Sequence, residues 1–292
     1  MCDTWGGILP PFFLMSEKYC EWNFTFFVKK KGIIIMKIYN NQKLTFHTLL
    51  LKCCVFIGVF VCSSSAYSQK TIVLNAAFSY PVSTDTQRGF ADQVLKEAFR
   101  RIGYALETVR MPAERALINA NRGIDDGDIA RVAGLEKKYP NLIQVPESYL
   151  TIDMVLFSKN NTEFVVKGWE SMLNHSLAII SGWKIMEKNF AKLGDKVEII
   201  KTDNAIQSFT LLEKDRVEFV AYSNWSGLGY IKKNKISNIK LLHPPLASPK
   251  LYVYLHKKHK SIVPKLADEI KKMKADGTVS DIFNKTLKPL LQ

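Results

Sequence analysis

The sequence predicts an α/β fold with largely parallel sheets, and two observations support this prediction. From residue 71 onward, short apolar and β-branched runs alternate with stretches whose apolar residues recur at helical spacing. The alternation restarts near residue 177, and a last strand pattern at residues 251–255 precedes two helical patterns. Strands that alternate with helices of this length favour parallel sheets covered by helices.

The first half of the pattern runs from residue 71 to residue 157. We expect a helix whose apolar face begins at Phe90 and which Gly103 ends. A second, shorter helix begins at Pro112, because the first helical position has no need of an N–H, and Gly123 ends it. Strands are expected at residues 71–77, 105–109, 129–133, 142–145 and 151–157.

The second half begins with a strand at residues 177–180 that turns at Ser181 and Gly182 into a helix starting near Trp183. Asp203 is expected to cap the next helix, which runs through Leu212. The remaining strands are expected at residues 197–200, 217–221 and 251–255, and the remaining helices at residues 225–231, 263–274 and 279–287.

The N-terminal region carries the pattern of a secretory signal peptide. Residues 53–61 form an apolar run of about nine residues, too short to span a bilayer, which takes about 20. Lysines precede this run, and Ala66 and Ser68 follow it at the small positions of a cleavage site. We therefore predict that residues 36–68 are a signal peptide and that the protein is exported to the periplasm. An N-terminal membrane anchor is the alternative.

Residues 1–35 resemble neither a signal nor a domain, because their aromatic residues follow no period. Lys31 and Gly32 can be encoded by a purine-rich ribosome-binding sequence just ahead of Met36. Our hypothesis is that Met36 is the true start and that residues 1–35 are a non-native leader. All five cysteines lie at or before Cys62, so the exported chain would fold without disulfides.

The formal charge of +14 raises the question of nucleic-acid binding. The excess is mostly lysine in dispersed clusters, such as residues 232–235 and 257–260, without an arginine-rich stripe or aromatic stacking platform. We therefore expect no nucleic-acid partner, and instead solubility and attraction to anionic solutes. We also expect no cofactor or metal: residues 125–128 lack the spacing of a calcium loop, and His256 and His259 lack further ligands.

The chain resembles the bacterial extracellular solute-binding proteins of family 3, the polar amino-acid type that serves ABC transporters. The resemblance covers nearly all of residues 72–287 and rests on weak motifs that occur in the right order. These are AAFSYP at 76–81, GFAD at 89–92, GDIAR at 127–131, PESY at 146–149, WESML at 169–173 before LAIISG at 177–182, KDRVEFV at 214–220 and MKADGT at 273–278.

The resemblance implies two α/β lobes joined by two crossover strands, with a ligand cleft between them. The first lobe would comprise residues 71–157 and 248–292, and the second residues 158–247. The implied function is capture of a small polar or carboxylate-bearing solute, an amino acid or organic acid, for an ABC-type importer. The protein would be a monomer and no enzyme, with a membrane permease complex as its partner.

Two other functions remain open from the sequence. The protein could be a sensory protein that docks on a membrane receptor. It could also be a cleft enzyme resembling cyclohexadienyl dehydratase, for which Glu114 or Glu147 would supply the acid or base.

Arg131 is the leading candidate for a ligand anchor. It lies where apolar strand residues are expected, and its guanidinium can hold a carboxylate through two parallel hydrogen bonds. The alternative is a structural ion pair with Asp128 or Glu136. Relatives carry their carboxylate-binding arginine in a later Thr-x-x-Arg element, which this chain lacks, and Arg115 is the second candidate. We expect the fold to survive removal of Arg131, because its side chain would face a cleft.

Aromatic and small residues complete the predicted site. The resemblance implies that Phe78 and Tyr80 form an aromatic wall after the first strand, and Tyr149 and Trp183 are further candidates, although each could instead belong to the core. Ser181 and Gly182 lie at a strand-to-helix turn, where free N–H groups favour an anion.

Ser223 and Asn224 stand where amino-acid binders usually carry an aspartate for the ammonium group of the ligand. These two neutral residues supply no counter-charge. The departure places an α-amino-acid ligand in doubt, and a carboxylate or polar solute without an ammonium group fits about as well.

Overall fold

The structure is a computed structural model that describes residues 69–160 and 163–291. The predicted leader and signal peptide, residues 1–68, lie outside the described residues. The described residues belong to one compact unit that spans Tyr67–Gln292. Within it, none of the helices has both the length and the apolar composition that a membrane crossing requires.

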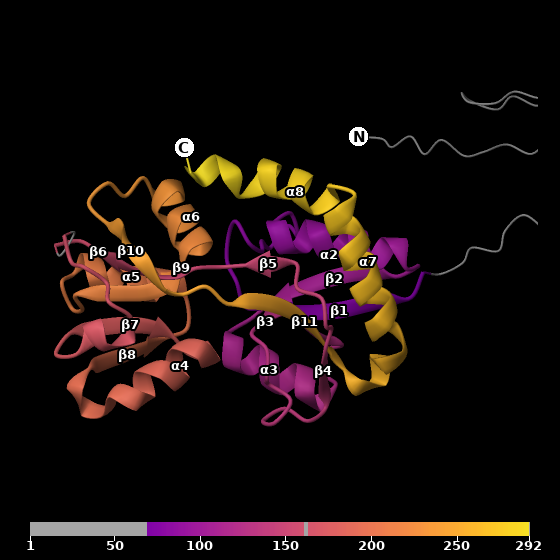
Figure 1. Cartoon of the computed structure of the whole chain (residues 1–292), viewed down its shortest axis with the longest axis horizontal. Helices are drawn as coiled ribbons and strands as arrows, with labels where there is room; N and C mark the ends of the chain where they lie inside the picture. Colours follow the sequence, from indigo (N-terminus) through magenta and orange to yellow (C-terminus); the bar gives the residue numbers. More distant parts are fainter. Residues whose placement is uncertain (1–68, 161–162, 292) are drawn as a thin grey trace, which may run out of the picture. The chain divides into compact units, whose positions relative to one another are not determined.

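One mixed sheet organises the N-terminal part of this unit (Figure 1). Strand β1 pairs in parallel with β2 and β3, as the alternation of strands and helices predicts, and β11 returns antiparallel to β3. The strands, in sheet order, are β2 (Ala105–Arg110), β1 (Thr71–Ala76), β3 (Gly127–Arg131), β11 (Lys250–His256) and β4 (Leu142–Gln144), with β5 (Leu150–Thr151) paired to β11.

Four helices accompany this sheet, and together they form what we call the first lobe. The predicted helix after β1 is present, and Asp92 in its first turn accepts hydrogen bonds from the backbone N–H of Gly89 and from Ser83 and Thr108. This buried carboxylate holds the loop that carries Phe78 against the helix. The helices are α2 (Phe90–Arg101), α3 (Ala113–Arg122), α7 (Val263–Ala275) and α8 (Thr278–Thr286), with the 3₁₀ turns η3 (Lys257–Ile262) and η4 (Lys288–Leu291).

A second mixed sheet and three helices form the second lobe. The strands, in sheet order, are β10 (Lys240–Ala247), β6 (Met154–Ser158), β9 (Phe219–Ser223), β7 (Ser176–Ile180) and β8 (Glu198–Thr202). The helices are α4 (Lys184–Phe190), α5 (Ala205–Glu213) and α6 (Asn224–Asn234), with the 3₁₀ turns η1 (Trp169–Met172) and η2 (Ala191–Lys196).

Three sequence-based expectations need correction. Strand β10 was not predicted, because Pro244 and Pro245 interrupt its pattern; an edge strand tolerates proline, and β10 pairs only with β6. Residues 151–157, expected as one strand of the first lobe, divide between β5 and β6, so residues 154–157 belong to the second sheet. Asn204, rather than Asp203, caps α5, where its side chain accepts a hydrogen bond from the Gln207 N–H at 3.0 Å.

Two short segments, residues 152–153 and 248–249, connect the lobes, and we call them the hinge. The Ile152 N–H donates to the Pro249 carbonyl at 3.2 Å, and the Ser248 hydroxyl donates to Asp153 at 2.6 Å. The C-terminal elements also bridge the lobes, and α8 runs toward α6 in Figure 1. The rings of Trp225 in α6 and Phe283 in α8 lie 5.5 Å apart. Besides the two hinge segments, contacts of α6 with α8 and η4 therefore also join the lobes.

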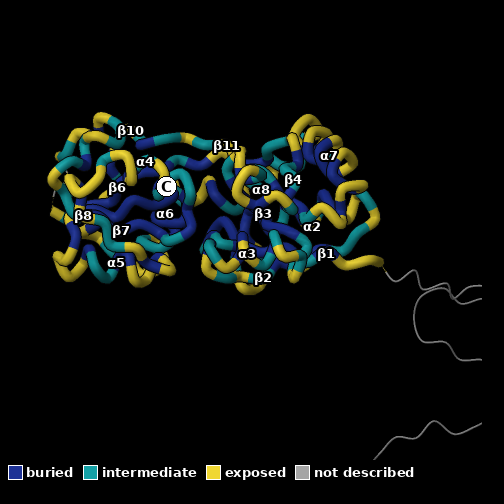
Figure 2. The backbone as a smooth tube through the Cα atoms, turned by 90° about the horizontal axis from the view of Figure 1, so that it is seen from below, coloured by how far each residue is buried: buried dark blue, intermediate teal, exposed yellow. Residues whose placement is uncertain are grey.

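Buried apolar side chains form a main core cluster that extends through both lobes. Figure 2 shows buried segments of the backbone in both lobes. It includes Leu74 and Phe99 of the first lobe and Phe209 and Phe219 of the second. Since Phe78, Met154 and Trp183 belong to the same cluster, the apolar core reaches the place where the lobes meet.

Candidate ligand-binding cleft

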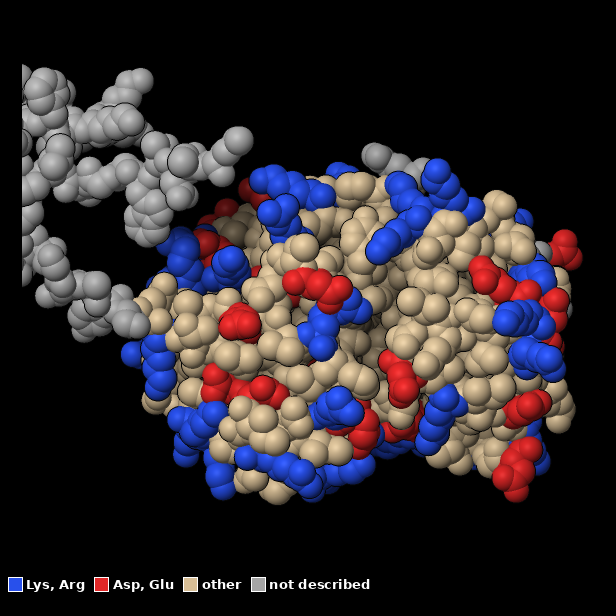
Figure 3. All heavy atoms as spheres, turned by 180° about the vertical axis from the view of Figure 1, so that it is seen from behind, with Lys and Arg blue, Asp and Glu red and all other residues tan. Residues whose placement is uncertain are grey.

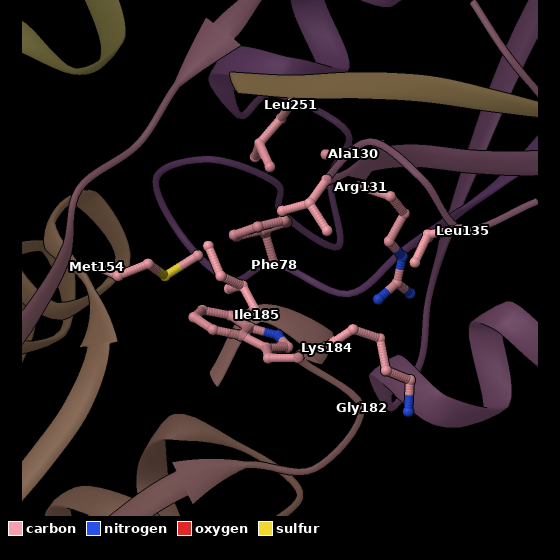
Figure 4. A pocket seen from close by; sticks show the side chains of 11 residues that line it. Phe78, Ala130, Arg131, Leu135, Met154, Gly182, Lys184, Ile185 and Leu251 are labelled. Carbon is pink, nitrogen blue, oxygen red and sulfur yellow. The ribbon is translucent and has the colours of Figure 1, made fainter. Parts of the chain in front are cut away.

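A small cavity lies where the two lobes meet, and residues of both lobes line it (Figure 4). Its volume is about 30 Å³, room for about two water molecules. A solute as large as an amino acid therefore fits only if the lobes move apart. The first lobe contributes Phe78, Ala130, Arg131, Val132, Leu135 and Leu251, and the second contributes Met154, Gly182, Trp183, Lys184 and Ile185.

Arg131 lies at the end of β3 and reaches the cavity, with only 6% of its surface exposed. One terminal nitrogen, Nη2, donates to Asp128 at 2.6 Å and to the Ala113 carbonyl at 2.9 Å. The Nε–H of Arg131 has no acceptor among the described residues. Arg131 thus forms the predicted structural pair with Asp128, and it also lines the interlobe cavity.

Asp128 is completely buried, and this burial raises the pKa of its carboxyl group, whereas the charge and hydrogen bond of Arg131 oppose the rise. The carboxylate also accepts a hydrogen bond from the Ala130 N–H at 3.1 Å. A buried carboxylate is destabilising when its ionic partner is removed. We therefore expect removal of Arg131 to lower the stability of the fold, contrary to the expectation from the sequence.

Aromatic rings cover one side of the cavity. The rings of Phe78 and Trp183 come from opposite lobes and lie 5.1 Å apart. Trp183 stacks in turn on Tyr222, with centroids 4.8 Å apart and planes 7° apart. The indole Nε1–H of Trp183 is buried and has no acceptor in the described part of the chain. Of the predicted aromatic wall of Phe78 and Tyr80, only Phe78 lines the cavity, and Trp183 lies beside it there.

An ion-pair cluster links the lobes beside the cavity. Lys184 of α4 donates to Glu114 at the start of α3 and, at 2.9 Å, to Glu187 within its own helix. Burial raises the pKa of Glu114, but the hydrogen bond and charge of Lys184 outweigh it, so that this pKa lies below its ordinary value of 4.5. Burial lowers the pKa of Lys184, and its bonds to Glu114 and Glu187 outweigh that effect and raise it.

This cluster predicts a pH dependence of lobe closure. A lowered carboxyl pKa means that the Glu114 contribution is present above pH 4.5 and is lost as the pH falls through the folded-state pKa. We expect solution scattering to show an increase in the radius of gyration below about pH 4.5. In the variant Glu114→Gln the radius of gyration should not change with pH over that range. If this variant expands at low pH as the wild type does, the assignment to Glu114 is wrong.

Small residues allow the lobes to approach closely at two further points. Gly182, at φ +83°, abuts the backbone of Ala113 and Glu114, and a Cβ atom there would lie 2.5 Å from the Glu114 nitrogen. Gly229 of α6 abuts Tyr80 and Pro81 in the same way. Between these points the hydroxyls of Ser79 and Tyr222 lie 3.2 Å apart, across the lobe boundary. The close approach of the lobes thus depends on the missing side chains of Gly182 and Gly229, both of which belong to the second lobe.

Six predicted ligand-binding residues lie away from the cavity lining. Tyr80 is 44% exposed and contacts α6, and Arg115 is exposed on α3 without an ion pair among the described residues. Ser181 is half-buried and its N–H donates to the Thr202 carbonyl at 2.8 Å, which continues the pairing of β7 with β8.

The other three are Tyr149, Ser223 and Asn224. Tyr149 is in the core of the first lobe: it is 4% exposed, donates to the Ile129 carbonyl at 2.9 Å and stacks on Phe90. The Ser223 side chain caps α6, and the Asn224 side chain accepts a hydrogen bond from the Asp153 N–H in the hinge at 3.2 Å. These side chains are committed to structural contacts.

Tyr149 offers a test of this distinction. The substitution Tyr149→Phe removes a buried hydrogen bond and leaves the Ile129 carbonyl without its partner, which costs about 1–3 kcal/mol. For a chain of this size we expect the melting temperature to fall by roughly 2–12 °C, measured by differential scanning calorimetry. Ligand affinity should not change. If Tyr149→Phe instead has wild-type stability and a lower ligand affinity, Tyr149 belongs to the ligand site.

Several cavity residues were not found from the sequence. Lys184 could have been selected, since it directly follows Gly182 and Trp183 at the same turn. Met154 and Leu251 could not, because they flank the hinge and only the pairing of the sheets brings them to the cavity.

The two candidate acids of an enzyme are held by lysines: Glu114 by Lys184 and Glu147 by Lys274. Within residues 69–160 and 163–291, no group of three or more His, Cys, Asp or Glu side chains is arranged to hold a metal ion. On the face shown in Figure 3, lysines and arginines are scattered and acidic residues lie between them. That face therefore presents mixed charge and no continuous basic stripe.

Comparison with known proteins supports the predicted fold. No family model matches the sequence. An uncharacterized protein of Shewanella oneidensis is 26% identical over 242 residues, which cover 76% of this chain and 89% of that protein.

Solved structures of amino-acid-binding proteins share the fold. A mutant of ArgBP from T. maritima superposes with a TM-score of 0.65 at 17% identity, covering 76% of this chain and 97% of that chain. The amino acid ABC transporter substrate-binding protein AbpA from Streptococcus pneumoniae, bound to L-arginine, superposes with a TM-score of 0.65 at 16% sequence identity. The match covers 77% of this chain and 98% of that chain. The GluR0 ligand-binding core with L-glutamate superposes with a TM-score of 0.64 at 15% sequence identity, and the match covers 77% of this chain and 100% of that chain. The predicted two-lobed fold of periplasmic binding proteins is thereby confirmed.

Proposed function

We propose that this chain, which has the fold of amino-acid-binding proteins of ABC transporters, is a solute-binding protein of family 3. It captures a small polar or carboxylate-bearing solute, an amino acid or organic acid, between its lobes. It then presents the solute to the permease of an ABC-type importer. The mechanism is binding and closure, without chemistry.

The observation that carries this proposal is the position of Arg131. Arg131 lines the cavity between the two lobes, together with the aromatic residues Phe78 and Trp183. Clefts of this kind, apolar with a few well-placed polar groups, are typical of sites for small molecules. The short hinge at residues 152–153 and 248–249 can absorb the rotation that admits a solute and then encloses it.

Export and partners follow from the same proposal. The protein acts in the periplasm as a monomer, after removal of the signal peptide predicted at residues 36–68. A permease complex is its partner. The sensory alternative uses the same cleft and differs only in its partner, a membrane receptor, so genes that neighbour this one separate the two.

A thermal-shift screen tests the proposal. Purified protein is heated with amino acids, organic acids, amines and sugars. A ligand at 100 times its dissociation constant stabilises the folded state by about 2.7 kcal/mol. For a chain of this size that is a rise in melting temperature of roughly 5–10 °C. The same ligand should reduce the radius of gyration in solution scattering. A tight ligand that causes no compaction, or a screen without any ligand, would argue against this function.

A further inference from the structure

We propose that the cleft selects a carboxylate with an apolar body and no ammonium group, in preference to an α-amino acid. The proposal rests on the solute-binding function above and specifies its ligand. Three features of the cavity support it: two N–H donors without acceptors, the signs of the charges around the cavity, and its apolar walls.

The two donors are the Nε–H of Arg131 and the indole Nε1–H of Trp183. Both residues line the cavity, one from each lobe, and neither nitrogen has an acceptor among the described residues. Leaving a buried donor without a partner is unfavourable, and more so when the group is charged. An oxygen-bearing anion between the lobes would satisfy both donors, and its two oxygens would thereby hold the lobes together.

The charged side chains that line the cavity itself are cations. They are Arg131 and Lys184, and no carboxylate of the described residues is part of the lining. The carboxylates behind them are occupied: Asp128 binds Arg131, and Glu114 and Glu187 bind Lys184. The ammonium group of an amino acid would therefore be desolvated without a free counter-charge. This agrees with the lack of an aspartate at Ser223 and Asn224.

The remaining walls suit a hydrocarbon body. Phe78, Leu135 and Leu251 of the first lobe face Met154 and Ile185 of the second (Figure 4). These side chains gain by covering apolar surface of the ligand and offer it no further side-chain hydrogen bond. A branched aliphatic or aromatic carboxylate matches both the donors and these walls.

Two sets of three compounds with matched bodies test the selectivity. The first is isocaproate, leucine and isoamylamine, and the second is hydrocinnamate, phenylalanine and phenethylamine. We expect isothermal titration calorimetry of the purified protein to show at least tenfold tighter binding of an acid than of its matched amino acid. The matched amine should not bind.

The variant Trp183→Phe tests the second donor. It keeps an aromatic ring against Phe78 and Tyr222 and removes the indole N–H together with one of the two fused rings, a loss of volume that the control below shares. Because that N–H has no partner within the fold, the melting temperature should stay within a few degrees of wild type. Affinity for the acid should fall roughly ten- to hundredfold, the loss expected for a hydrogen bond to a charged group. Trp169→Phe, in the same lobe but outside the cavity lining, is the matched control and should leave affinity unchanged.

Each result separates this inference from the broader function. An amino acid or amine that binds more tightly than its matched acid overturns the inference and leaves the solute-binding function intact. The inference is also overturned if none of the acids binds while the wider screen finds another ligand. If the wider screen finds no ligand at all, both proposals fail. Wild-type affinity for the acid in Trp183→Phe removes the indole donor from the site and with it the two-donor argument.

Discussion

Replacement of Arg131 by alanine should lower both the stability of the protein and its affinity for the ligand. The substitution leaves the fully buried Asp128 carboxylate without its ionic partner. Removing one member of a buried pair costs about 3–5 kcal/mol. For a chain of this size the melting temperature should fall by roughly 6–20 °C, measured by calorimetry. Arg131→Lys should recover only part of the affinity, because an ammonium lacks the two-pronged geometry of guanidinium.

A double variant separates the structural role of Arg131 from its ligand role. Arg131→Gln combined with Asp128→Asn removes both charges and keeps a hydrogen-bonding group at each position. We expect most of the lost stability to return, while affinity remains about 30- to several-thousand-fold below wild type, the loss of roughly 2–5 kcal/mol expected for a desolvated charged partner. Wild-type affinity in the double variant would end the ligand role of Arg131.

Arg115→Ala is the control for both variants. This arginine is exposed on α3 and forms no ion pair in the described part of the structure, so its removal should change neither property. A loss of affinity confined to Arg115→Ala would move the ligand anchor to that residue.

Gly182→Ala should prevent the lobes from closing. A Cβ atom at this position would lie 2.5 Å from the Glu114 nitrogen and 2.9 Å from the Ala113 carbonyl carbon. Both atoms belong to the backbone at the start of α3, which cannot give way as a flexible side chain could. We expect affinity to fall at least tenfold, because less of the protein reaches the closed, binding-competent state. Solution scattering should show no compaction when ligand is added.

The control for Gly182 must carry the same backbone strain. Gly103 also has a positive φ, +86°, and an added Cβ atom there meets nothing within 4 Å. Gly103→Ala should therefore lower stability to a similar degree through the left-handed backbone while leaving closure and affinity unchanged. Normal compaction of Gly182→Ala with ligand would refute the role of this contact in closure.

Most elements of the fold could be predicted from the sequence, because hydrophobic periodicity is a local signal. The helix from Pro112 to Gly123 is an example: proline and glycine mark its two ends, and the structure places α3 between them. Prediction failed where the pairing between strands, rather than the local sequence pattern, decides whether a segment forms a strand. Strand β10 contains two prolines and exists through its pairing with β6, and the break at residues 152–153 arises because β5 and β6 join different sheets.

The candidate site could be predicted only in part. Arg131 was selected because a charge within a strand is unusual, and Phe78 because the resemblance implies an aromatic wall there; both line the cavity, as does the aromatic candidate Trp183. Tyr149 was selected as a further aromatic candidate and Asn224 from the aspartate position of amino-acid binders, and they lie in the core and at the hinge. Residue type says what a side chain can do; only its surroundings decide whether a ligand or the protein itself uses it.

The sequence by itself determined the class of fold and the order of its strands and helices, because these depend on short-range periodicity and on the residues that begin and end each element. Only the tertiary structure decided that Arg131 pairs with Asp128, that Lys184 reaches Glu114 across the lobes and that Gly182 abuts α3. The last two contacts join residues about 70 positions apart in the chain. Their formation depends on how the lobes pack, and no local pattern encodes that arrangement.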